Sequence, residues 1–303
     1  MTISQTETRE GPGPHQAVSA FFWRRHGLLG WLLAAPPILW LTIFYLGALI
    51  ALFVSSLWQV DSMTGQVRPE WTLKNFALLV HEPVYQKIAL RTVGMAIAVT
   101  ITDCLLAVPL AYFMTWIAPA RWRSLLTMLV LVPLWSSLLA RVYAWRLILS
   151  HDGIANWALG ALGLPSSSIG YSLWAVWLVF SYLWLPFVIL PTVAALERVP
   201  HSLIDASADL GAGAFQTFRK VILPLAMPGL AAGSISSFAL TLGDFVTPML
   251  VGGAGSDFIG NAIYSAVGIA NNTPFAAAFA TVPLVMTGLY LLAMRKLGAF
   301  EAV

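Results

Sequence analysis

The chain has 303 residues, of which 59% are hydrophobic and 10% are charged, and its mean hydropathy is +0.80. This composition excludes a soluble globular domain, because such domains carry about a quarter charged residues. The formal net charge of +3 comes from scattered basic residues, which excludes a basic surface for nucleic acid. We therefore expect an all-α polytopic integral membrane protein.

Six apolar segments long enough to cross a bilayer follow one another along the chain. Residues 1–27 form a polar tail and an interfacial anchor, and residues 28–296 form the membrane domain. Pro36 and Pro37 are expected to divide the first apolar run into an interfacial turn and a span. The predicted spans are 38–57, 92–117, 125–149, 173–196, 226–250 and 275–294, with polar loops at 58–89, 150–170 and 252–274.

The distribution of lysine and arginine predicts which side of the membrane each loop faces, because cytoplasmic segments carry an excess of these residues. With six spans, both ends of the chain lie on one side. A cytoplasmic amino end places ten of the sixteen basic residues inside, namely Arg9, Arg24, Arg25, Arg121, Arg123, Arg198, Arg219, Lys220, Arg295 and Lys296. Both termini and the segment between the fourth and fifth spans are therefore expected in the cytoplasm.

The segment 205–224, DASADLGAGAFQTFRKVILP, has the pattern of a folded unit between two spans. Ser202 is a suitable N-cap for a short helix that runs into this segment. Gly211 with Gly213 predicts a left-handed end to that helix. A second short helix is expected to follow, ending near Val221.

This segment resembles the EAA loop of permease subunits of type I ABC importers, with Asp for Glu, Ser for the second Ala and Val for Ile. The resemblance implies a MetI-like permease fold whose cytoplasmic coupling helix docks onto an ATPase subunit. We call residues 197–225 the coupling loop. The residues that the resemblance assigns to ATPase coupling are Asp205, Ala206, Ser207, Gly211, Leu223 and Pro224.

The same resemblance implies partners. They are two copies of an ABC ATPase subunit, a second permease subunit that is a homologue of this one or a second copy of it, and a periplasmic substrate-binding protein. The complex would lie in a bacterial inner membrane. None of the four lysines follows the glycine pattern of a phosphate-binding loop, so ATP and Mg²⁺ are expected on the ATPase subunits. The five histidines stand far apart, and we expect neither a catalytic site nor a metal site in this chain.

Two further segments, 133–145 and 243–253, resemble the spermidine/putrescine branch of these permeases. The resemblance implies import of a polyamine. Other solutes of the same importer class remain open at this point, namely an amino-acid derivative, an opine or an anion. An ion-coupled secondary transporter is the alternative from another class.

Charged residues inside the spans are candidates for the solute path, because a bare charge at such depth costs at least about 2.5 to 3.5 kcal/mol. At about 1.5 Å per residue, Asp103 lies roughly 16 Å, Arg141 roughly 12 Å and Asp244 roughly 9 Å below the outer span ends. Arg141 could instead pair with one of the two carboxylates. Nearby aromatic rings could add cation–π contacts to an amine. The predicted pathway residues are Asp244, Asp103, Arg141, Trp135, Tyr143 and Trp145.

Overall fold

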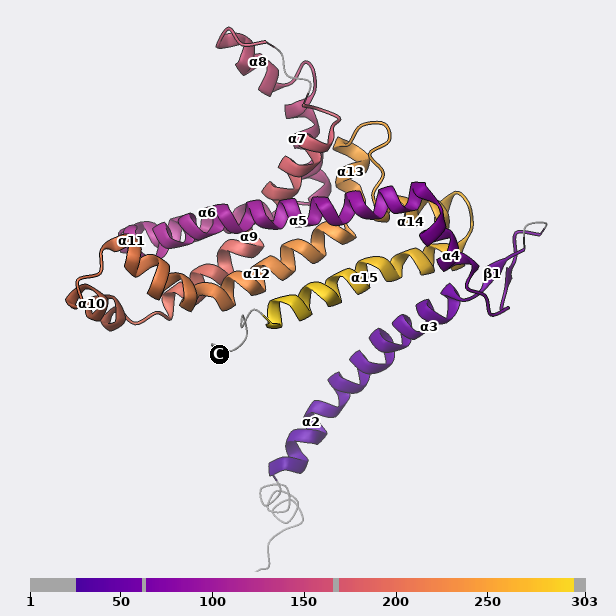
Figure 1. Ribbon diagram of the computed structural model, residues 1–303, viewed down its shortest axis with the longest axis horizontal. Coiled ribbons are helices and arrows are strands. Elements are labelled where there is room, and N and C mark those ends of the chain that lie inside the picture. The colour runs from indigo at the N-terminus through magenta and orange to yellow at the C-terminus, as the bar shows by residue number, and fades with distance from the viewer. Residues whose placement is uncertain (1–25, 62–63, 166–168, 297–303) are drawn as a thin grey trace, which may run out of the picture. The chain divides into compact units, whose positions relative to one another are not determined.

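A computed structural model describes residues 26–61, 64–165 and 169–296 (Figure 1). The predicted tail and anchor at 1–27 lie almost entirely outside the described residues. The chain divides into two units, residues 1–54 and residues 55–303, which are described separately. Within these described residues, five helices are long and apolar enough to cross a membrane, and the number is six if one sharply bent pair counts as a single span.

The first unit is helical from α2 (His26–Leu41) through a π-turn, η1 (Thr42–Leu46), into α3 (Gly47–Ser56). Pro36 and Pro37 lie inside α2, so the predicted interfacial turn at these residues is wrong. Membrane helices tolerate proline where local π adjustments, such as η1 directly after α2, satisfy the freed backbone groups again.

The second unit begins with a small antiparallel hairpin of β1 (Gln59–Val60) and β2 (Val67–Arg68), followed by α4 (Lys74–His81). The buried Asn75 side chain fixes the start of α4, since its Nδ2 donates to the carbonyl oxygens of Ser56 at 2.9 Å and Trp58 at 2.8 Å. The predicted loop 58–89 therefore contains ordered structure and also the first turns of the next span.

Four long helices form the centre of the second unit. They are α5 (Pro83–Tyr112), which continues as the π-turn η2 (Phe113–Ile117), α9 (Leu173–Glu197), α12 (Leu223–Gly243) and α15 (Thr273–Lys296). The predicted fourth and sixth spans are confirmed by α9 and α15. The second span is confirmed but starts earlier, at Pro83.

The closest helix contact is between α9 and α12. A Cβ atom placed on Gly233 would lie 2.6 Å from the Cα atom of Val188, and one on Gly229 would lie 2.3 Å from the carbonyl oxygen of Pro191. In a membrane, small residues spaced four apart let two helix backbones approach, and dispersion contacts then stabilise the pair. The glycines at this spacing therefore set how α12 sits on α9.

The fifth span differs from the prediction of 226–250. A short helix α11 (Ala214–Thr217), the π-turn η3 (Phe218–Ile222) and α12 form one continuous helix from Ala214 to Gly243. After Asp244 the chain begins a separate short helix, α13 (Val246–Val251). The span therefore begins inside the coupling loop and ends earlier than hydropathy indicates.

The third span is broken. Helix α6 (Ala120–Trp135) ends at Ser136, and the helices that follow, α7 (Leu138–Leu149) and α8 (Ile154–Ala161), turn away by 95°. The hydroxyl of Ser136 donates to the carbonyl oxygen of Pro133 at 2.8 Å, which satisfies a backbone group freed by the break. Figure 1 shows α7 leaving the layer formed by α5, α12 and α15.

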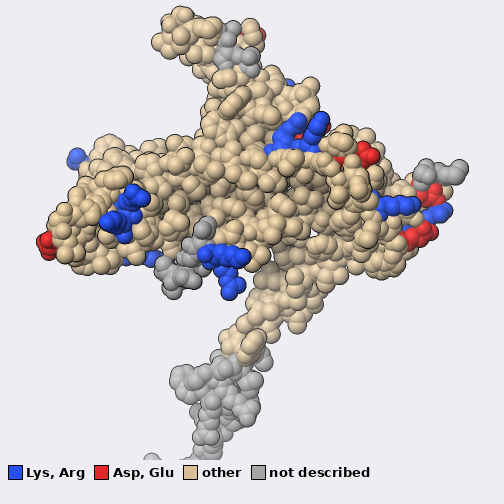
Figure 2. All heavy atoms as spheres, viewed as in Figure 1, with Lys and Arg blue, Asp and Glu red and all other residues tan. Residues whose placement is uncertain are grey.

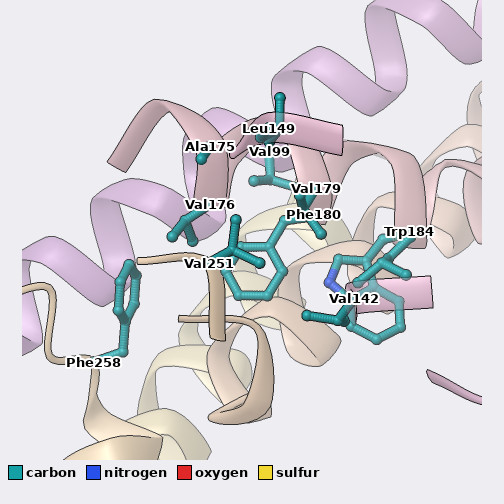
Figure 3. Packing of buried hydrophobic residues seen from close by; sticks show 11 residues of the cluster. Val99, Val142, Leu149, Ala175, Val176, Val179, Phe180, Trp184, Val251 and Phe258 are labelled. Atoms are coloured by element: carbon teal, nitrogen blue, oxygen red, sulfur yellow. The ribbon is translucent and has the colours of Figure 1, made fainter. Parts of the chain in front are cut away.

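Helix α7 is held by an apolar cluster with α9 and α13 (Figure 3). Val142 of α7 packs with Phe180 and Trp184 of α9 and with Val251 of α13. Another helix, α14 (Ile259–Gly268), lies in the predicted loop 252–274 and packs against α15. On the face drawn in Figure 2, charged atoms form a few small groups, and most of the surface belongs to uncharged residues.

Candidate functional site

The coupling loop consists of a short helix, a tight turn and the start of the fifth span. Helix α10 (His201–Asp209) follows Pro200, which is its N-cap and makes no side-chain capping bond. The prediction of Ser202 as N-cap is therefore wrong, and Ser202 lies inside the helix. Pro200 is compatible with a helix start because its ring fixes φ and no hydrogen bond is required from it there.

The end of α10 confirms the left-handed cap predicted at Gly211. This residue has φ +77°, its N–H donates to the carbonyl oxygen of Ala208 at 2.8 Å, and the N–H of Ala212 donates to that of Ser207 at 3.0 Å. This pair of bonds is the Schellman pattern. Gly213 has φ −73° and begins the next helix, so it takes no part in the left-handed turn.

The predicted coupling residues fall into three environments. Asp205, Ala206 and Gly211 are exposed, whereas Ser207 is buried. The hydroxyl of Ser207 lies 2.8 Å from that of Thr217, which is buried in α11. Leu223 and Pro224 lie inside the continuous helix and do not mark the end of the loop, because the helix passes through them.

Two exposed apolar side chains of the loop were not predicted. Leu210 is 89% exposed and Phe215 is 75% exposed, on either side of the glycine turn. Both side chains flank the glycine turn, and exposed apolar patches mark contact surfaces for other proteins. The sequence signal was available, since both residues interrupt an otherwise polar or small-residue stretch.

Two ring contacts join the loop to the end of the second span. The ring of His201 in α10 packs against Trp116 of η2 with centroids 4.6 Å apart, and Phe218 of η3 packs against Tyr112 at 5.4 Å. Both η2 and η3 are π-turns. Such turns within α-helices are frequent at functional sites. The coupling loop therefore contacts two spans, α5 and α12, at the same end of the bundle.

Asp103 is fully buried in α5, and its Oδ2 accepts a 2.6 Å hydrogen bond from the hydroxyl of Ser237 in α12. Its Oδ1 has no hydrogen-bond partner among the described residues. Asp103 therefore joins two spans, and one of its two carboxylate oxygens has no donor among the described residues.

Asp244 lies where α12 ends, and its carboxylate caps α13. The Oδ1 atom accepts from the backbone N–H groups of Val246 at 2.7 Å and Thr247 at 3.1 Å, and Oδ2 accepts from the Thr247 hydroxyl at 2.6 Å. The residue is 8% exposed. These three bonds give Asp244 a structural role that the sequence interpretation did not include.

The other predicted pathway residues lie at or beyond the break in the third span. Within the described chain no ion pair joins Arg141 to Asp103 or Asp244, so the alternative pairing is not found. The depth assigned to Arg141 assumed a straight span and is also wrong, because the residue lies in α7. Its Nε is buried without a partner among the described residues.

The three predicted aromatic residues differ in their surroundings. Trp135 is 84% exposed at the end of α6, and Tyr143 is 48% exposed on α7. Trp145 instead packs against Tyr182 of α9, with ring centroids 5.3 Å apart. Contact of these three rings with a solute remains a prediction.

Comparisons with known proteins agree with the helical arrangement. Residues 20–297 match the family described as binding-protein-dependent transport system inner membrane component. The chain is 46% identical over 316 aligned residues to the inner membrane ABC transporter permease protein YdcU of Escherichia coli K12, covering 100% of this chain and 99% of that protein.

A second relative is the spermidine/putrescine transport system permease protein PotB of Salmonella typhimurium SL1344. It is 34% identical over 256 residues, covering 84% of this chain and 88% of that protein. Among solved structures, a chain of a bacterial alginate ABC transporter in complex with an alginate pentasaccharide-bound periplasmic protein matches with a TM-score of 0.74. That match has 17% identity and covers 93% of this chain and 97% of the other, and it shows the shared fold.

Proposed function

Because this chain belongs to the binding-protein-dependent transport system inner membrane component family, we propose that it is the permease subunit through which a polyamine enters the cytoplasm. As a member of this family, the chain is a multi-pass inner-membrane permease of an ABC importer. The proposed solute is spermidine or putrescine, delivered by a periplasmic binding protein. ATP with Mg²⁺ would be hydrolysed on two separate ATPase subunits.

The polyamine proposal rests on the relatives named as spermidine/putrescine permeases, which match most of this chain. The segments 133–145 and 243–253 carry the corresponding resemblance. The relative that matches over its whole length is named without a substrate, so its name neither supports nor opposes a polyamine.

The coupling loop carries the proposal that ATPase subunits bind this chain. Its exposed surface combines the two large apolar side chains Leu210 and Phe215 with the carboxylates of Asp205 and Asp209. The apolar side chains would be covered by a cleft of the ATPase, and the carboxylates would select basic residues at its rim. Gly211 fixes the turn between the two apolar side chains.

For the solute path we propose Asp103 as the principal residue contributed by this chain. It lies about 30 Å along α5 from Pro83, roughly two thirds of the way along this helix, at about 1.5 Å per residue. Its unpartnered Oδ1 can accept from an ammonium group once α5 and α12 move apart. Asp244 would contribute by holding α13 and, with it, the cluster that positions α7.

A second candidate solute is an anion of the same importer class. It is favoured by Arg141, whose guanidinium has a buried and unpartnered Nε and no carboxylate partner in the described chain. An anion would supply the charge-assisted hydrogen bonds that this group lacks.

The proposed assembly contains a second permease subunit, homologous or identical, beside this one. Both termini are proposed to lie in the cytoplasm, on the side of the coupling loop, as the distribution of basic residues predicts.

Uptake by the reconstituted complex tests the solute directly. Proteoliposomes containing the permeases and ATPase, with ATP inside and binding protein outside, would be supplied with labelled putrescine, spermidine or a competing organic anion. We expect ATP-dependent accumulation of a polyamine, blocked when Asp103 is replaced by Asn. Accumulation of the anion alone would overturn the polyamine proposal, and accumulation without ATP would overturn the importer mechanism.

A further inference from the structure

Inside the coupling loop, a hydrogen bond between two buried hydroxyl groups joins α10 to α11, the short helix that begins the fifth span. Ser207 lies on the last turns of α10 and Thr217 ends α11, ten residues later. Their oxygen atoms are 2.8 Å apart, and the residues are only 9% and 7% exposed.

Ser207 connects to the following segment in two ways. Its carbonyl oxygen accepts the Ala212 N–H in the turn, and its hydroxyl meets Thr217 beyond the turn. The turn is short and contains two glycines, whose backbone is less restricted than that of other residues. The hydroxyl bond is a side-chain link that adds to the two Schellman bonds in opposing a pivot of α10.

Thr217 lies near the beginning of a long helix. The helix that contains it runs without a break from Ala214 to Gly243, about 45 Å at 1.5 Å per residue. Helix α10, in contrast, touches the spans mainly through His201 and the apolar side chain of Ile204. A displacement of α10 reaches the fifth span as a rigid-body movement only if the angle between the two helices is held.

We propose that the Ser207–Thr217 hydrogen bond sets this angle, so that both are positioning residues for coupling between the ATPase and the membrane helices. This inference rests on the proposed function, because it assumes that α10 docks onto an ATPase. Coupling between distant sites requires packed elements with defined arrangements, and a helix that pivots dissipates the displacement. The ATPase would then still bind, but hydrolysis and transport would become less tightly linked.

Matched substitutions distinguish the loss of the hydroxyl hydrogen bond from a change in side-chain size. Ser207→Ala removes one oxygen atom and places the residue of the EAA pattern at this position. Thr217→Val removes the other hydroxyl at nearly constant shape, whereas Thr217→Ser keeps it. Ser202→Ala removes an exposed hydroxyl from the same helix and is the control.

The first readout is ATP hydrolysis by the complete complex in lipid discs, stimulated by loaded binding protein, together with the amount of ATPase that co-purifies. We expect Ser207→Ala and Thr217→Val each to lower stimulated hydrolysis about three- to tenfold, the equilibrium effect of one buried hydrogen bond. The double variant should be no worse than Thr217→Val, and the ATPase should still co-purify. Thr217→Ser and Ser202→Ala should behave as the unchanged chain.

The second readout does not depend on the ATPase. Spin labels on cysteines introduced at the exposed positions Asp209 and Gln216, with Cys104 replaced, report the distance between α10 and α11. A broader distance distribution in Ser207→Ala supports the proposal. An unchanged distribution, or strictly additive losses of hydrolysis in the double variant, would overturn it. If the unchanged complex showed no stimulated hydrolysis, the proposed function would fail, and the label distances alone would decide this inference.

Discussion

Replacement of Gly211 by valine perturbs the coupling loop at a single backbone position. At φ +77° a residue with a side chain is strained by about 1 to 2 kcal/mol, and β-branching places valine at the upper end or beyond. A Cβ atom at this position would meet no other atom within 4 Å, so strain is the whole cost. At about 2 kcal/mol the Schellman turn becomes up to about 30-fold less favourable relative to alternative conformations of the loop.

Gly213 provides a matched control two residues away. Its φ of −73° is allowed for valine, and a Cβ atom there also meets nothing within 4 Å. We expect Gly211→Val to abolish most binding-protein-stimulated ATP hydrolysis, while the amount of permease in the membrane stays normal. Gly213→Val should keep hydrolysis, and Gly211→Asn should keep most of it because asparagine tolerates this region. Normal stimulated hydrolysis in Gly211→Val would refute the role assigned to the turn.

Three further predictions concern the membrane helices. Gly233→Val should prevent recovery of folded permease by size-exclusion chromatography, because its Cβ atom would overlap the α9 backbone. The control Gly94→Val should be recovered normally, because its Cβ atom meets nothing within 4 Å. Equal yields of the two variants would contradict the close contact between α9 and α12. Asp244→Ala should lower the melting temperature by the loss of a helix cap worth about 1 to 2 kcal/mol, and an unchanged melting curve would exclude the capping role. Ser237→Ala should destabilise the protein by about 1 to 3 kcal/mol because it leaves a buried carboxylate without its donor, but should cost less in an Asp103→Asn background. Equal costs in both backgrounds would show that the two side chains do not act together.

The sequence alone predicts the bounds of those helices whose ends carry local signals. Helix α9 was predicted within one residue at its end, since Ser172 caps its start and its apolar run ends at charged residues. The left-handed end of α10 was predicted for a comparable reason, because a glycine follows the helical pattern directly.

Hydropathy could not show the break in the third span. Apolar residues continue across Ser136 and Ser137, and a hydropathy average is insensitive to the direction of the chain. The available signals were Pro133 and the two serines, whose side chains can satisfy backbone groups freed by a bend. The opposite error occurred at Pro36 and Pro37, where two prolines are accommodated inside a helix.

Asp244 shows why a buried charge does not by itself identify a solute site. Intramembrane carboxylates are functional candidates by default, and on this basis the sequence predicts a solute-facing role for Asp244. The spacing of Asp244 and Thr247 also matches a local capping pattern, in which the side chain accepts bonds from the following turn. The contact of Asp103 with Ser237, in contrast, joins residues 134 positions apart and has no signal in a single sequence.

The most direct test of the account is ATP hydrolysis by the complex that co-purifies with this chain in lipid discs, with and without loaded binding protein. The account predicts a co-purifying ATPase whose activity is stimulated by the polyamine-loaded protein and loses that stimulation in Gly211→Val. A chain that purifies without any ATPase, or an ATPase that is indifferent to both the binding protein and the coupling loop, would contradict it.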